Sequence, residues 1–166
     1  MRLAPGGARR RTASKGPAQM LTVLIVDDDE AIRRKAMRAL ADPGIQLASA
    51  ANGRLALEEA ARLQPDIVIC DVDMPEVNGF DVLAALKADA DLAGAQVMLL
   101  TSLSSRSSVR LGMSLGADDY LTKPFTDDEI RDAFDGLMKR RGRMEVLRDA
   151  AVRKGEDSMP ARAESN

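Results

Sequence analysis

Five short apolar runs alternate with helical patterns along this chain of 166 residues. The runs expected to form strands lie at residues 21–26, 45–51, 67–70, 97–100 and 120–123. After each run, apolar residues recur every three or four positions, as on one face of a helix, within residues 31–42, 53–64, 80–88, 105–115 and 127–137. Strands and helices that alternate through short connections form a parallel sheet covered on both faces, built from right-handed crossovers. We therefore predict an α/β fold with five parallel strands.

Several polar residues and one glycine mark the expected ends of the helices. Asp29 favours the start of the first helix, because aspartate caps helix amino termini well. Thr126 and Glu129 have the spacing of a capping box at the start of the fifth helix. Gly116 is well placed to end the fourth helix.

Composition limits the chemistry that the chain can perform. An apolar fraction of 45% and a charged fraction of 30% are typical of a soluble globular protein, and the length suits one domain with tails. Cys70 is the only cysteine and there is no histidine, which excludes a disulfide framework, a Cys/His zinc site and a histidine-activated nucleophile. Carboxylates, hydroxyls and lysine remain. No apolar run suits a membrane span or a secretory signal, so we expect a cytoplasmic protein.

Charge is distributed unevenly along the sequence. Residues 1–19 carry five basic residues and no acid, and residues 142–166 carry five of each. The net charge of −2 therefore leaves −7 on residues 20–141. An acidic body argues against nucleic acid as the main ligand of the folded part, and we expect no specific DNA binding. We predict that the basic leader, residues 1–19, is disordered; Met20 is an alternative start of the protein.

Functional residues are expected where the apolar runs end. The segment Asp66 to Gly79 passes from a buried strand into Asp71, Asp73 and a turn that contains proline. In the predicted sheet, the carboxyl ends of four strands bring together two acids after the first strand, one after the third, a threonine and a lysine. These residues are Asp27, Asp28, Asp71, Thr101 and Lys123.

That set of side chains indicates a site for phosphoryl chemistry. Three carboxylates close together repel one another unless a cation lies among them, and hard oxygen ligands favour Mg²⁺, with Mn²⁺ as the alternative. Lys123 and Thr101 suit the oxygens of a phosphoryl group. Asp71 is the expected nucleophile, forming an acyl phosphate, because Asp27 and Asp28 are adjacent and better suited to hold metal.

In these features the chain resembles the receiver domain of two-component response regulators, of the CheY-like kind, over residues 21–140. The resemblance rests on VLIVDDDE (23–30), PDIVICDVDMPEVNGFDVL (65–83), LLTS (99–102) and LGADDYLTKPF (115–125). It implies a flavodoxin-like (βα)5 fold with strand order 2-1-3-4-5.

The resemblance also implies a role for each residue of the site. Asp71 would be the phosphoacceptor, and Asp27 and Asp28 would bind Mg²⁺ with Asp71 and the backbone carbonyl of Asp73. Thr101 and Lys123 would contact the phosphoryl group. Tyr120 would change rotamer as Thr101 moves toward that group.

The function implied is a signalling switch rather than an enzyme. A sensor histidine kinase or a phosphotransfer protein would phosphorylate Asp71, and the altered face around the fourth and fifth helices would bind an unknown protein target. We expect a stand-alone receiver over residues 20–141, and a homodimer linked to phosphorylation stays open. The alternatives are a haloacid-dehalogenase-like phosphatase using Asp71 and Asp73, and a receiver-like module that binds a partner regardless of phosphorylation.

The polar tail, residues 142–166, allows two interpretations. Met144, Leu147 and Ala151 form a weak helical stripe, which is either a frayed extension of the fifth helix or a helix for dimerisation or docking. Residues 156–166 are expected to be disordered.

Overall fold

The computed structural model describes residues 20–102 and 106–156 and contains a single five-stranded parallel sheet. The strand order is β2-β1-β3-β4-β5, which confirms the predicted fold class and topology. In chain order the elements are β1 (Leu21–Val26), α1 (Glu30–Ala39), β2 (Ile45–Ala50), α2 (Gly53–Leu63), β3 (Ile67–Asp71), α3 (Gly79–Ala88), β4 (Gln96–Ser102), α4 (Arg106–Ser114), β5 (Asp119–Lys123) and α5 (Asp127–Glu156).

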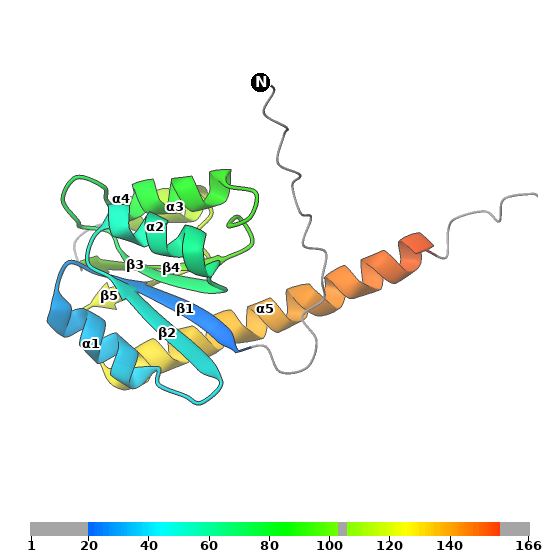
Figure 1. The fold of residues 1–166 in the computed structure, drawn as a ribbon, viewed down its shortest axis with the longest axis horizontal. Coiled ribbons are helices and arrows are strands. Elements are labelled where there is room, and N and C mark those ends of the chain that lie inside the picture. Colours follow the sequence, from blue (N-terminus) through cyan, green and yellow to red (C-terminus); the bar gives the residue numbers. More distant parts are fainter. Residues whose placement is uncertain (1–19, 103–105, 157–166) are drawn as a thin grey trace, which may run out of the picture.

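Helices cover both faces of the sheet, with α1 and α5 on one side and α2, α3 and α4 on the other (Figure 1). Each face packs against its own apolar cluster, one containing Leu83 and Leu86 and the other Ile130 and Leu137. Every residue of β3 is buried, because this strand lies at the centre of the sheet between the two clusters. A central strand of this kind reads as a continuous apolar run, which is the pattern seen in the sequence.

The predicted helix ends agree with the structure. The Asp29 side chain caps α1 by accepting a hydrogen bond from the backbone N–H of Ala31 at 2.8 Å. The Thr126 hydroxyl accepts a hydrogen bond from the Glu129 backbone N–H at 3.1 Å, and the Glu129 carboxylate accepts one from the Thr126 backbone N–H at 2.7 Å, as a capping box requires. Gly116 has a φ of +97°, a left-handed conformation that glycine adopts without strain.

Strand β4 is longer than the sequence predicted. Its pairing with β5 continues through Thr101, opposite Thr122, and Ser102, opposite Lys123. The threonine and serine therefore lie within the strand rather than in the loop after it, because the ladder with β5 satisfies their backbone groups. Helix α4 begins at Arg106; Ser105, where the sequence placed its start, lies outside the described residues.

Helix α5 is much longer than the others and projects beyond the sheet (Figure 1). It continues without interruption from Asp127 through residue 141 to Glu156, so the residue that was expected to begin the disordered end belongs to the helix. Side chains of residues 142–153 are all exposed. The predicted disorder of residues 1–19 and 157–166 falls outside the described residues. Within the described part of the chain, no helix has the length and apolar character needed to cross a membrane.

Candidate functional site

The parallel register brings the predicted site residues to the carboxyl edge of the sheet. Asp71 is the last residue of β3, and Lys123 is the last residue of β5. Asp27 follows β1 directly, and Val26 pairs with Cys70, the residue before Asp71. Because neighbouring parallel strands end together, side chains that are 44 to 96 positions apart in the sequence meet at one place.

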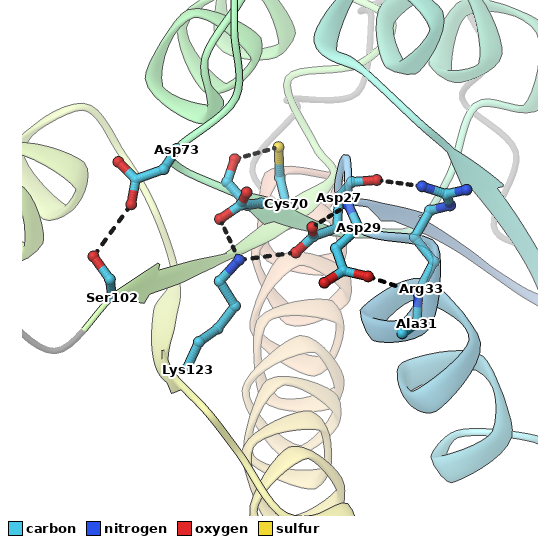
Figure 2. Close-up of polar contacts among 9 residues, drawn as sticks. Asp27, Asp29, Ala31, Arg33, Cys70, Asp73, Ser102 and Lys123 are labelled. Carbon is cyan, nitrogen blue, oxygen red and sulfur yellow. Dashed lines mark hydrogen bonds and ion pairs between the residues drawn. The ribbon is translucent and has the colours of Figure 1, made fainter.

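Lys123 forms ion pairs with two of the acids (Figure 2). Its Nζ atom lies 2.9 Å from Asp71 Oδ1 and 3.1 Å from Asp27 Oδ2. The side chains of Asp71 and Asp27 are 1% and 0% exposed, and that of Lys123 is 19% exposed. The ammonium is therefore largely shielded from water, and its charge acts on both carboxylates at short range.

Asp28 completes a cluster of three carboxylates. One oxygen from each of Asp27, Asp28 and Asp71 lies within 4.8 Å of the others, a spacing that one ion can bridge. Asp28 is exposed to solvent, whereas its two partners are buried, so the cluster opens to water on one side. Three negative charges face the single positive charge of Lys123, which leaves an excess that a divalent cation would neutralise.

Burial changes the protonation of this cluster. Loss of water raises the pKa of Asp71 and of Asp27 above their usual values, and Lys123 offsets part of that shift. Burial by itself would lower the pKa of Lys123, but its ion pairs with Asp71 and Asp27 outweigh this effect and raise the pKa. The lysine therefore stays charged, whereas burial makes the charged form of the two carboxyl groups less stable than it would be in water.

The carboxylate of Asp71 is incompletely satisfied. Its contact with Lys123 is close enough for an ion pair but does not have the direction of a good hydrogen bond, and Oδ2 accepts none from the described residues. Buried oxygens of this kind are rare in folded proteins, and a bound cation is one way to satisfy them. The donor set therefore fits Mg²⁺, which prefers carboxylate oxygens and retains open positions for other ligands.

Local structure fixes the positions of the two buried acids. Asp27 Oδ1 accepts a hydrogen bond from the backbone N–H of Asp29 at 2.9 Å, and the Asp27 carbonyl accepts one from Arg33 at 2.7 Å (Figure 2). Behind Asp71, helix α3 begins in close contact with β3. A Cβ atom at Gly79 would lie 2.3 Å from the Asp71 carbonyl oxygen, so only glycine fits there.

The two expected switch residues, Thr101 and Tyr120, lie on the adjacent strands β4 and β5. Thr101 is buried, and its hydroxyl donates to the backbone carbonyl of Ser102 at 2.9 Å. Tyr120 is 45% exposed, so its ring is not packed beneath Thr101. Thr101 lies near the carboxyl end of β4, where its hydroxyl is engaged by its own strand rather than by the acids, whereas Tyr120 is the second residue of β5, opposite Leu99.

Some contacts of the site were not predicted from the sequence. Ser102 Oγ donates to Asp73 Oδ2 at 3.2 Å, joining the loop after β3 to the end of β4 (Figure 2). Arg33 supports Asp27 from α1, and Lys35 of the same helix donates to the Phe125 carbonyl just beyond β5. Exposed polar and basic residues are too common in sequences to reveal such pairs before the fold is known.

Cys70 takes no part in this chemistry. Burial raises the pKa of its thiol, and the neighbouring carboxylates of Asp71 and Asp27 raise it further. The neutral thiol donates weakly to the Asp71 carbonyl at 3.4 Å. The cysteine is therefore a small core residue, because an acidic neighbourhood disfavours the thiolate.

Fold and site together agree with one protein family. The family model for the response regulator receiver domain matches residues 23–135. The chain belongs to the response regulator receiver domain family, which confirms the resemblance seen in its motifs.

Individual relatives are longer than this chain. It is similar to the probable transcriptional regulatory protein TcrX of Mycobacterium tuberculosis, with 34% identity over 128 residues, which are 77% of this chain and 54% of TcrX. It is also similar to the response regulator MprA of Mycolicibacterium vanbaalenii, with 37% identity over 118 residues, 71% of this chain and 50% of MprA. The chain thus spans about half the length of these curated relatives.

Solved structures show the same fold. The chemotaxis response regulator CheY4 of Vibrio cholerae superposes with a TM-score of 0.66 and 32% identity, covering 70% of this chain and 98% of CheY4. The receiver domain of DrrB, in a structure described as activated by BeF3, gives a TM-score of 0.63 and 29% identity, covering 74% of this chain and 97% of that domain.

Proposed function

We propose that this chain is a phosphorylation switch in which Asp71 accepts a phosphoryl group from a sensor histidine kinase or a phosphotransfer protein. The observation that carries the proposal is the meeting of Asp27, Asp71 and Lys123 at one buried edge of a receiver domain. Phosphoryl transfer is catalysed mainly by positioning and by stabilisation of negative charge, and this edge offers both.

In the proposed reaction, an Asp71 carboxylate oxygen attacks phosphorus while the bond from phosphorus to the donor's imidazole nitrogen breaks. The electron pair of that bond stays on the nitrogen, and Asp71 becomes an acyl phosphate. Oδ2 is suited to the attack, since it accepts no hydrogen bond from the described residues. Lys123 remains beside Asp71 and stabilises the negative charge on the transferred oxygens.

The proposed reaction depends on Mg²⁺, with Mn²⁺ as the alternative. Asp27, Asp28 and Asp71 would hold the ion through carboxylate oxygens, and Asp73 would add its backbone carbonyl. When bound, the ion neutralises charge on the phosphoryl group during transfer. The excess of carboxylates over ammonium groups in the site supports this requirement.

Phosphorylation would act on the rest of the domain through Thr101 and Tyr120. The Thr101 hydroxyl now donates within its own strand, and a phosphoryl oxygen on Asp71 offers it a charged acceptor. Movement of Thr101 would allow the exposed ring of Tyr120 to pack inward. The energy of this change comes from contacts that exist in only one of the two states.

Intact mass spectrometry tests the phosphoacceptor. The protein is incubated with acetyl phosphate and Mg²⁺, and wild type is compared with Asp71→Asn, which preserves the size of the side chain. We expect one phosphoryl group on wild type, none on the variant, and none on wild type when EDTA replaces Mg²⁺. Equal labelling of wild type and Asp71→Asn would refute the proposal.

The phosphatase alternative is now disfavoured by family membership. It would require Asp73 as a general acid, yet the Asp73 carboxylate accepts a hydrogen bond from Ser102 across the mouth of the site. Asp73→Asn separates the two mechanisms, since a phosphatase would lose turnover of a phosphomonoester. A receiver would still become phosphorylated on Asp71.

We further propose that the output of the receiver domain is a protein partner. The charge of −7 over residues 20–141 opposes binding of this part of the chain to nucleic acid. TcrX, which is named as a probable transcriptional regulatory protein, is matched over only 54% of its length, so its output is not carried over to this chain. Site-specific binding of duplex DNA by the purified protein would contradict this part of the proposal.

A further inference from the structure

Within the described part of the chain, no other element buries the second half of α5. Every side chain from residue 142 to 153 is exposed, and Met144, Val146 and Leu147 have exposed fractions of 65%, 69% and 69%. Isolated helices of about 12 residues are marginal in water, and Gly142 lowers the helix propensity further. A partner that packs against this half would stabilise it and cover its apolar side chains.

A cleft lies where this half of α5 leaves the domain. It has a volume of about 320 Å³ and its apolar lining includes Ala93, Ala95 and Met144. Its charged lining residues are the bases Lys87, Arg141 and Arg148 and the acids Asp118 and Glu145. Residues 93–95 lead into the amino end of β4, so the cleft lies at the opposite end of the sheet from Asp71. Lys87 pairs with Asp118 and Arg141 pairs with Glu145, so Arg148 is the basic residue of the cleft that has no ion pair with a described residue.

Charge distinguishes this half-helix from the domain that carries it. Residues 139–154 contain seven bases and two acids, a net charge of +5, whereas residues 20–138 contain 11 bases and 21 acids, a net charge of −10. Arg143, Arg148 and Arg153 form no ion pair with any described residue. Their charges therefore remain available to a partner. An acidic ligand would be attracted to this half of α5 and repelled by the rest of the domain.

We propose that the cleft and the adjoining face of α5 dock an acidic, amphipathic helical segment of a partner protein. Apolar side chains of that segment would pack on Met144, Ala93 and Ala95, and its carboxylates would pair with Arg148 and its neighbours. This surface is separate from the phosphorylation site, so the inference does not depend on the proposed function.

Other occupants match the surface less well. A flat lipid bilayer cannot enter a cleft bounded by both the helix and the loop before β4. Nucleic acid phosphates would pair with the arginines but would leave Met144 and Leu147 uncovered. A second copy of the same half-helix would bring two segments of charge +5 together, which opposes self-association.

Fluorescence anisotropy with a labelled synthetic peptide tests this inference. The peptide is rich in glutamate with leucine at every third or fourth position, and a matched peptide replaces each leucine with serine. We expect the full-length protein to bind the leucine peptide, to bind the serine peptide at least about tenfold more weakly, and to lose affinity as salt is added.

Two double variants with the same change in charge locate the binding surface. Met144→Asp with Arg148→Glu alters the cleft, whereas Val146→Asp with Arg153→Glu alters residues of the same helix that do not line it. We expect affinity to fall at least about tenfold in the first variant and less than about threefold in the second. Circular dichroism spectra and thermal melting curves, unchanged in both, show that each variant is folded.

Several outcomes would overturn the inference. They are no binding of the leucine peptide, equal weakening by the two double variants, or tighter binding of duplex DNA or phosphatidylglycerol vesicles than of the peptide. Sedimentation of the protein alone as a dimer that Met144→Asp with Arg148→Glu dissociates would assign the surface to a second copy instead.

Discussion

Replacement of Lys123 by methionine isolates the contribution of the buried ammonium group to phosphoryl transfer. Methionine keeps the apolar stem of the side chain and removes its charge. Two ion pairs are lost, at 2.9 Å to Asp71 and 3.1 Å to Asp27. At 19% exposure of the lysine side chain, the surrounding water screens this charge only partly.

The expected effect on rate follows from Coulomb's law. A unit charge about 4 Å from the ammonium is stabilised by roughly 4 kcal/mol at an effective dielectric constant near 20. If about half to three quarters of a charge gathers on the adjacent phosphoryl oxygen during transfer, removal of the ammonium raises the barrier by about 2–3 kcal/mol. That change corresponds to a rate of phosphorylation roughly 30- to 150-fold lower.

The assay follows the mass of the protein over time with acetyl phosphate at saturating Mg²⁺. Lys87→Met is the matched control, because Lys87 lies 4.0 Å from Asp118 at the other end of the sheet. The rate of phosphorylation of Lys87→Met should equal that of wild type. Mg²⁺ affinity of Lys123→Met, measured by calorimetry, should not fall, since the lysine is a competing cation and not a ligand. A rate within about threefold of wild type would refute the role assigned to Lys123.

Three further predictions concern stability. Burial raises the folded-state pKa of Asp27, so the contribution of this group to stability is fully present below its unfolded pKa and is lost as pH rises through the folded pKa. In EDTA, the stability of Asp27→Asn relative to wild type, measured by urea unfolding, should therefore increase between pH 4 and 7. Addition of Mg²⁺ should reverse the difference. Gly79→Ala should cost about 1–3 kcal/mol by thermal melting, because its Cβ would lie 2.3 Å from a backbone oxygen, whereas Gly94→Ala, with open space around it, should be nearly neutral. Arg141→Met should cost about 3 kcal/mol, because it removes the arginine that pairs with the buried Asp66 at 2.8 Å. The exposed Arg143→Met should cost less than about 0.5 kcal/mol, and equal effects of the two variants would contradict the argument.

The sequence predicted the elements of the fold because the patterns that specify them lie within a few consecutive residues. The continuous apolar run of residues 67–70 belongs to a strand buried on both faces, and such strands show no alternation of polar and apolar residues. Asp29, Thr126 and Gly116 gave correct helix ends because caps act within a few residues of the chain. The end of β4 was misplaced because its last two residues are held by pairing with β5, which lies about 20 positions later in the sequence.

The sequence also predicted which residues form the candidate site, but it did not predict the contacts between them. Alternation of strands and helices requires Asp27, Asp71 and Lys123 to end at the same edge of the sheet. The sequence does not show that Lys123 contacts both acids, that Ser102 reaches Asp73, or that the Thr101 hydroxyl is engaged by its own strand. Those contacts depend on rotamers and on loop positions, which are chosen by packing around each side chain.

Sequence alone determined the alternation of five strands and five helices and the set of acidic, hydroxyl and amine groups, because periodicity and short motifs lie in consecutive residues. Its motifs also indicated the family, and that resemblance implied the strand order. Tertiary structure decided how deeply Asp27 and Asp71 are buried, and therefore how strongly their charges depend on Lys123 and on a cation. It also decided that α5 continues into an exposed basic half-helix beside a cleft, since a weak stripe of Met144, Leu147 and Ala151 does not reveal whether anything covers it. Burial is a property of the whole packed domain, and no local pattern of residues can supply it.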